Sequence, residues 1–160
     1  VTGYNDLLNI SKNGTYLYEG ENLPTDHMNF DAAGISGRVE SDSRSSGGKS
    51  LGHLASGSYF DFPFYLQGNA TLDLTLVLSK YEAISLKDYK LYMDGIEIAF
   101  ENPEMQLGRK EDGSNDWFNW KDCKVVSQAL AKGEHVFRFS LPGNVCNIDC
   151  LKFVISDFAA

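Results

Sequence analysis

Glu19 and Glu21 lie two residues apart in the segment YLYEGENL, residues 16–23, where their carboxylates could hold a cation. Side chains of a β-strand alternate between its two faces, so a strand here puts both carboxylates on one face with Leu17 and Leu23. Carboxylates separated by roughly 7 Å repel each other, and the repulsion grows when they are partly buried. Protonation, a neighbouring Arg or Lys, or a metal ion would relieve that repulsion.

Asp149 raises the same question near the other end of the chain. In the segment NVCNIDCLKFVI, a strand places Asp149 on the face of the core residues Leu151 and Phe153. If the first and last strands adjoin, three carboxylates converge. An all-oxygen set without a Cys or His cluster favours calcium, and backbone carbonyls of the polar loop at residues 41–50 could complete its shell.

An explanation without metal stays open at this point. The chain has 22 acidic residues, so two of them fall two positions apart by chance quite often. Asp149 could instead cap a turn or pair with Arg38 or Arg44. The residues alone therefore indicate a cation site without deciding for it.

The elements that must position these groups are strands. Alternating apolar residues predict core-facing strands in three segments, namely 58–64 (Phe60, Phe62, Phe64), 71–79 (Leu72, Leu74, Leu76, Leu78) and 135–141 (Phe137, Phe139, Leu141, or the other face with Val136). Asp94-Gly95 predicts a hairpin within residues 89–100, and residues 130–135 predict a turn. About ten strands with Gly-rich connections predict an all-β fold, an antiparallel β-sandwich.

Length and composition fit one globular domain, because 160 residues can bury a substantial core. We expect residues 16–160 to form that domain and residues 1–15 to be a linker end or an edge strand. The formal net charge of −8 argues against nucleic acid and anionic membrane surfaces as partners, since both reward clustered Lys and Arg. No apolar run reaches the roughly 20 residues that cross a bilayer.

The three cysteines are predicted to be small buried hydrophobic residues. Cys146 and Cys150 on one strand would be roughly 13 Å apart, which is too far for a disulfide. Cys123 could pair with either, but the odd count leaves a free thiol, and no Cys-x-x-Cys spacing suggests zinc.

Six dispersed segments, taken in order, resemble carbohydrate-binding modules of families 6 and 35, which are galactose-binding-like β-sandwiches of the jelly-roll type. The likeness extends over roughly residues 16–156. The segments are YEGEN, SSGGKSLGHL, LYMDGIEI, DWFNWKD, LAKGEHVFRFSL and NIDCLKF, which match the acidic opening strand, the Gly-Gly loop, a hairpin, the Trp-x-x-Trp segment, the turn and strand before the end, and the closing Asn-x-Asp strand.

The resemblance implies a structural calcium held by Glu19, Glu21 and Asp149, with a loop carbonyl as a further ligand. We assign that carbonyl to Arg44. The ion would tie both ends of the domain together and stabilise it by mass action.

The resemblance also implies a sugar site among the loops. The first Trp of the family motif, which forms one wall of that site, corresponds to Trp117. The Asn of the closing strand corresponds to Asn147. His53 stands where the family carries an aromatic residue facing the Trp, and an imidazole stacks less broadly than Tyr or Trp. The alternatives are loop packing for Trp117, a turn residue for Asn147 and a solvent-facing strand residue for His53. Trp120 is predicted to lie in the core.

The function implied is that of a non-catalytic module that binds a polysaccharide or glycan and targets an attached catalytic domain to its substrate. We expect a secreted or cell-surface, monomeric, bacterial-type module. The alternatives are an adhesive sandwich packed on a neighbouring domain, or a small glycosidase using Glu19 and Glu21. No His-Glu-x-x-His motif supports an enzyme of another class.

Overall fold

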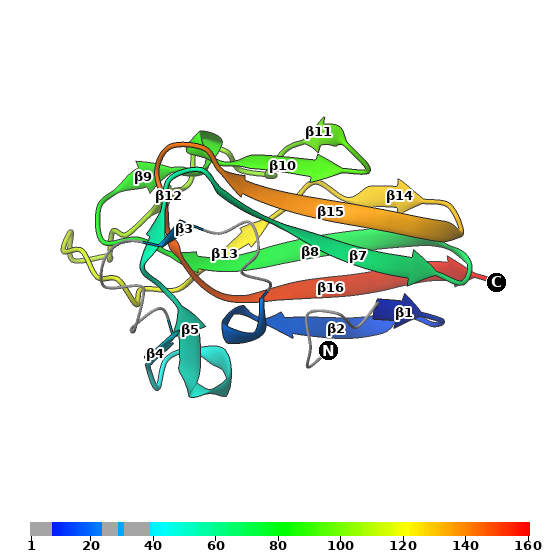
Figure 1. Cartoon of the computed structure of the whole chain (residues 1–160), viewed down its shortest axis with the longest axis horizontal. Helices are drawn as coiled ribbons and strands as arrows, with labels where there is room; N and C mark the ends of the chain where they lie inside the picture. Colours follow the sequence, from blue (N-terminus) through cyan, green and yellow to red (C-terminus); the bar gives the residue numbers. More distant parts are fainter. Residues whose placement is uncertain (1–7, 24–28, 31–38) are drawn as a thin grey trace.

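Two packed β-sheets form the body of the chain in the computed structural model, which describes residues 8–23, 29–30 and 39–160 (Figure 1). One sheet has the order β1-β7-β15-β10-β11, and the other has β13-β8-β16-β5-β4, with β14 also paired to β8 and β2 to β16. The strands are β1 Leu8–Ile10, β2 Gly14–Glu19, β3 Asn29–Phe30, β4 Val39–Ser41, β5 Lys49–Leu51, β6 Leu54–Ala55, β7 Ser58–Leu66, β8 Asn69–Ser79, β9 Ile84–Ser85, β10 Lys90–Met93, β11 Ile96–Ile98, β12 Gln106–Leu107, β13 Lys121–Lys124, β14 Gln128–Leu130, β15 Gly133–Leu141 and β16 Asn147–Ala159.

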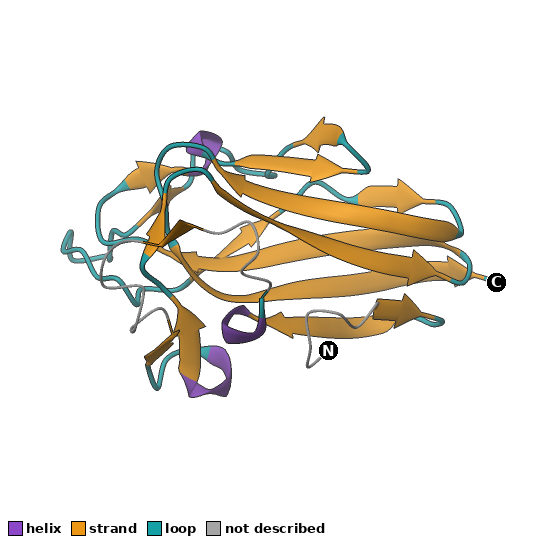
Figure 2. Cartoon of the chain, viewed as in Figure 1, coloured by secondary structure: helices purple, strands orange, loops and turns teal. Residues whose placement is uncertain are grey.

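The predicted antiparallel sandwich is confirmed, with the β1–β7 pair as a parallel exception. Among the described residues, helix is confined to three 3₁₀ turns, drawn purple in Figure 2: η1 Gly20–Asn22, η2 Ser46–Gly48 and η3 Leu86–Asp88. The described chain has sixteen strands rather than about ten, because several connections add two- or three-residue strands such as β3, β6 and β9. No described helix is long and apolar enough to cross a membrane.

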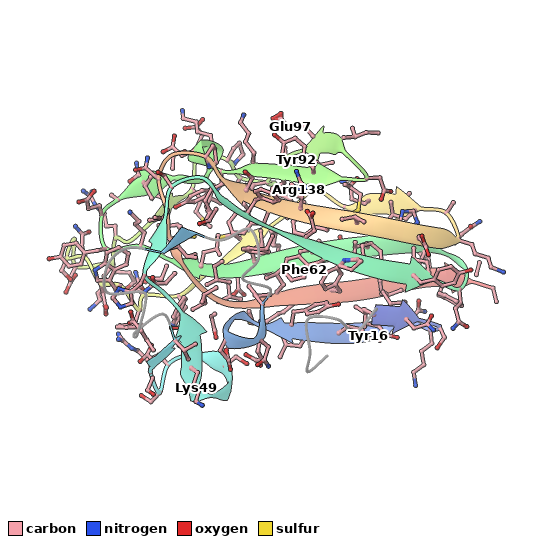
Figure 3. The ribbon with its side chains drawn as sticks, in the orientation of Figure 1. Tyr16, Lys49, Phe62, Tyr92, Glu97 and Arg138 are labelled. Carbon is pink, nitrogen blue, oxygen red and sulfur yellow. The ribbon has the colours of Figure 1, made fainter. Side chains whose placement is uncertain are left out.

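The core lies between the two sheets and is built from the predicted alternating residues. The inward faces of β7, β8 and β15 are buried, with the face of β15 carrying Phe137 rather than Val136. The ring of Phe62, labelled in Figure 3, packs from one sheet against Tyr18 and Phe153 of the other, with ring centroids 5.1 and 6.4 Å apart. This aromatic contact between the layers fixes their spacing.

The predicted hairpin at Asp94-Gly95 joins β10 and β11. Both turn residues have positive φ, 52° and 80°, which is the backbone of the tight turns that match strand twist. At the chain start, residues 8–10 form the outer strand β1, β2 already begins at Gly14, and residues 1–7 lie outside the described part.

All three cysteines are buried, as predicted, and all three are free thiols, so the disulfide left open for Cys123 is absent. Burial raises the pKa of each thiol, to about 12 for Cys146 and Cys150. Since the thiolate is the reactive form, these residues pack rather than react.

Candidate functional site

The face assigned to Asp149 from strand alternation is wrong, because β16 contains a bulge there. Ile148 pairs with Leu78 of β8, whereas Cys150 pairs with the adjacent Val77, so Asp149 is the extra residue between them. The bulge removes Asp149 from the face of Leu151 and leaves its side chain 4% exposed. Its carboxylate accepts hydrogen bonds from the Ser46 backbone N–H at 2.9 and 3.0 Å.

The strand assigned to Glu21 is also wrong, because β2 ends at Glu19 and Glu21 belongs to the turn η1. Gly20 makes this ending possible. A Cβ at Gly20 would collide with the carbonyl oxygens of Ile148 and Asp149, so only glycine lets the end of β2 approach the bulge so closely.

The three predicted carboxylates nevertheless gather around the loop that contains η2; we call Glu19, Glu21 and Asp149 the acidic cluster. Ser46 links two members, because its hydroxyl donates to Glu19 Oε1 at 2.7 Å while its backbone N–H donates to Asp149. Gly47, with φ 64°, lies beside the Glu21 carboxylate, since a Cβ on Gly47 would be 3.6 Å from Glu21 Oε1.

Burial and mutual repulsion raise pKa values within the acidic cluster. Burial raises the pKa of Asp149 to about 6, and the negative charges of Glu19 and Glu21 act in the same direction, against the hydrogen bond from Ser46. Burial also raises the pKa of Glu21, with Glu19 contributing. The cluster therefore lacks a compensating positive charge of sufficient strength.

Two carboxylate oxygens of the acidic cluster make no hydrogen bond, and such oxygens suit a hard cation. Glu19 Oε2 and Glu21 Oε2 are buried and have no hydrogen-bond partner. Among the described residues, no three His, Cys, Asp or Glu side chains already have the geometry of a metal site. The two orphaned oxygens are nevertheless suited to a hard cation, because carboxylate oxygens are the ligands that calcium prefers.

Arg44 contributes its side chain to the link between two loops. Its guanidinium donates to Asp42 at 3.1 Å and to Asp116 at 2.6 Å, and it lies over the Phe118 ring. Asp42 also accepts the indole N–H of Trp120 at 3.1 Å. These contacts tie the loop of the acidic cluster to the Trp loop, while the role of the Arg44 carbonyl as a ligand stays a prediction.

A cavity of about 310 Å³ lies near the acidic cluster. We call it the rim pocket, and it brings together the three residues assigned to a sugar site, Trp117, Asn147 and His53. Asn147 begins β16, only two residues before Asp149, so the pocket and the cluster share that strand. The complete lining is Glu40, His53, Leu54, Trp117, Phe118, Val145, Cys146 and Asn147.

Trp117 is 40% exposed, so a large aromatic surface is open to a ligand. Tyr81, itself 48% exposed, lies beside it with ring centroids 6.1 Å apart and a tilt of 32°. The ammonium of Lys80 sits 5.3 Å from the centre of the Trp117 ring. Trp120, predicted as core, is half-buried instead, because its indole N–H reaches outward to Asp42.

Two residues of this region were not predicted from the sequence. Glu40 lies in β4 and contacts His53, with Oε1 2.8 Å from Nε2. Tyr81 follows β8, outside the six segments that carry the resemblance. The alternation of apolar residues does not identify either one. Each reaches the site because of the path of a loop or short strand, and that path depends on strand pairing.

Known structures share this architecture. No protein-family model and no curated protein sequence matches the chain. A family 35 carbohydrate-binding module from Clostridium thermocellum superposes with a TM-score of 0.52 at 16% identity, over 87% of this chain and 98% of that one. The fold is that of family 35 and family 6 modules.

A second comparison supports the same fold from the family 6 side. The C-terminal family 6 module of a marine laminarinase from Zobellia galactanivorans gives a TM-score of 0.57 at 14% identity, over 88% of this chain and 99% of that one. A family 26 mannanase from Podospora anserina with a family 35 module gives 0.62 at 12% identity, over 93% of this chain and 29% of that one. The resemblance predicted from the sequence is confirmed at the level of fold.

Proposed function

We propose that the chain is a non-catalytic carbohydrate-binding module whose rim pocket binds a polysaccharide or glycan. The observation that carries the proposal is the meeting of Trp117, Asn147 and His53 in one open cavity of about 310 Å³. A sugar presents apolar C–H faces and a rim of hydroxyls. An exposed indole covers such a face, while an amide and an imidazole hydrogen-bond the rim.

A calcium ion in the acidic cluster is part of the proposal. Glu19, Glu21 and Asp149 would hold it, with a backbone carbonyl of the adjoining loop, for which Arg44 is the candidate. The ion would supply the positive charge that the buried carboxylates lack. Because the contacts of Arg44 and Asp42 join this loop to the Trp loop, calcium would also steady the pocket.

A binding role is favoured over hydrolysis by the distribution of carboxylates. In the described part of the chain, the pocket lining includes one carboxylate, Glu40, whereas glycoside hydrolysis uses a pair about 5 to 10 Å apart. Glu19 and Glu21 are engaged in the acidic cluster instead. We propose that the module targets an attached, secreted catalytic domain, and the mannanase comparison, in which a family 35 module accompanies a family 26 domain, supports the attachment.

A glycan array tests the proposal, run once with calcium and once with a chelator. We expect retention on at least one polysaccharide class in calcium and weaker retention in chelator. A protein that is folded in calcium yet retained on no glycan would refute the binding function.

A further inference from the structure

The floor of the rim pocket presents hydrogen-bond acceptors that converge above Gly52. A Cβ at Gly52 would lie 2.8 Å from Glu40 Oε1 and 3.1 Å from Asn147 Oδ1, so both oxygens border the space that a side chain would fill. Glycine keeps that space open between them. The pocket therefore offers two acceptor oxygens close enough to bind neighbouring hydroxyls of one ligand.

Neighbouring groups fix the orientation of both acceptors. Asn147 is buried and its Nδ2 donates to the Trp117 carbonyl at 3.4 Å, which turns Oδ1 toward Gly52. His53 holds the Glu40 carboxylate at 2.8 Å, and its own backbone has φ 60°, a conformation that non-glycine residues adopt rarely. A side chain held by such a backbone is positioned by the surrounding structure rather than by local preference.

Among the described residues, three cations lie around the pocket, and two of them are paired with a carboxylate. Arg44 and Lys110 both pair with Asp116, at 2.6 and 3.1 Å. Lys80 holds its ammonium 5.3 Å from the centre of the Trp117 ring, in a cation–π contact at the wall of the pocket. The formal net charge of −8 disfavours anionic ligands at long range, and within the pocket lining Glu40 supplies a negative charge.

We infer that Glu40 determines the charge of the sugar that the rim pocket accepts: it selects uncharged sugars with neighbouring free hydroxyls and rejects uronic acids. The inference rests on the proposed function, since it names the ligand class of the same pocket. A carboxylate accepts hydrogen bonds from two hydroxyls of a neutral sugar. A uronate would bring a second carboxylate close to Glu40, and two like charges in a partly desolvated pocket repel.

The test compares the wild-type chain with Glu40→Gln on neutral oligosaccharides (xylan, mannan, galactan and glucan) and on glucuronate and galacturonate oligosaccharides, in calcium. The wild type should bind a neutral sugar and show no measurable uronate binding. Glu40→Gln should weaken neutral binding by about 10-fold, because a charged acceptor becomes a neutral amide. It should also bring uronate binding into the measurable range.

Two further variants keep the result interpretable. Glu40→Asp retains the charge but shortens the side chain, so it should lose neutral affinity without gaining uronate binding. Glu97→Gln on β11 removes the same charge from a solvent-exposed pair with Lys90, and it should change neither ligand class. Unfolding temperatures of all variants report whether each one is folded.

The outcomes separate this inference from the proposed function. Uronate binding by the wild type that equals its neutral binding, or an unchanged ratio in Glu40→Gln, overturns the role of Glu40 while glycan binding stands. The absence of any glycan binding by the folded wild type overturns both. A gain of uronate binding in Glu97→Gln as well would assign the effect to net charge and also overturn the inference.

Discussion

The acidic cluster and the rim pocket share the first residues of β16, through Asp149 and Asn147, but they are built in opposite ways. The acidic cluster lies at strand ends, buries Asp149, and leaves the buried atoms Glu19 Oε2 and Glu21 Oε2 without hydrogen-bond partners. The rim pocket is open, draws on loops and exposes 40% of Trp117. We therefore expect changes in the first to act on stability and changes in the second to act on binding.

The two regions are also physically linked. Asn147 and Asp149 lie on the same strand, and Arg44 joins the loop of the acidic cluster to the Trp loop through Asp116. A change in the acidic cluster is therefore expected to alter both stability and binding. A change in the exposed ring of Trp117 is expected to alter binding alone.

The largest expected effect comes from calcium acting on the acidic cluster. Saturating calcium, at 100 times its dissociation constant, should stabilise the chain by about 2.7 kcal/mol, or about 5–10 °C in unfolding temperature. Asp149→Asn should abolish most of that gain, because it removes a charged ligand from the proposed set. Differential scanning calorimetry in calcium and in chelator measures both; an equal calcium response in Asp149→Asn would remove Asp149 from the site.

An intermediate effect is the pH dependence of stability in chelator. The pKa of Asp149 is raised to about 6 in the folded chain, above its ordinary value of 3.8, so the folded state binds the proton more tightly than the unfolded state. The associated stability is present below about pH 4 and is lost as the pH rises through about 6. We expect a loss on the order of 1 kcal/mol, reduced by solvent screening.

The same experiment in calcium reverses the trend, since ionised carboxylates are the ligands of the cation. Urea unfolding between pH 4 and 7, in chelator and in calcium, provides the comparison. Asp149→Asn serves as the control, because it lacks the titrating group and should flatten the chelator curve. A wild-type curve in chelator that rises over this range would contradict the assignment.

The smallest expected effect concerns the edge of the rim pocket. Tyr81→Ala should lower affinity for a chain of several sugar units by about 3-fold, since Tyr81 extends the aromatic platform of Trp117. A single sugar unit should bind almost unchanged. Tyr65→Ala on β7 is the matched control on another part of the surface. Isothermal titration with ligands of increasing length checks this, and equal losses for all lengths would refute an extended platform.

Strand identity was predictable from sequence because burial follows alternation. Phe60, Phe62 and Phe64 face the core as their period of two requires, and Asp94-Gly95 turns where its residue types favour positive φ. These signals are local, so each can be predicted from the residues of its own segment.

The faces of the acidic residues were not predictable in the same way. The bulge at Asp149 and the end of β2 at Glu19 arise from pairing between segments that are distant in sequence. The three carboxylates do lie around one loop, although alternation gave the wrong reason for their meeting, and their role as calcium ligands stays a prediction. Glu40 and Tyr81 were missed because their positions depend on loop paths that no periodic pattern encodes.

The central claim is that Trp117 carries glycan binding, and calorimetric titration of the best array ligand into Trp117→Ala in calcium tests it most directly. We predict an affinity loss of at least about 10-fold with an unchanged unfolding temperature, because an exposed ring contributes stacking and little core. Trp120→Phe is the matched control; losing its hydrogen bond to Asp42 should lower stability while keeping most of the affinity. Binding by folded Trp117→Ala as tight as that of the wild type would contradict the account.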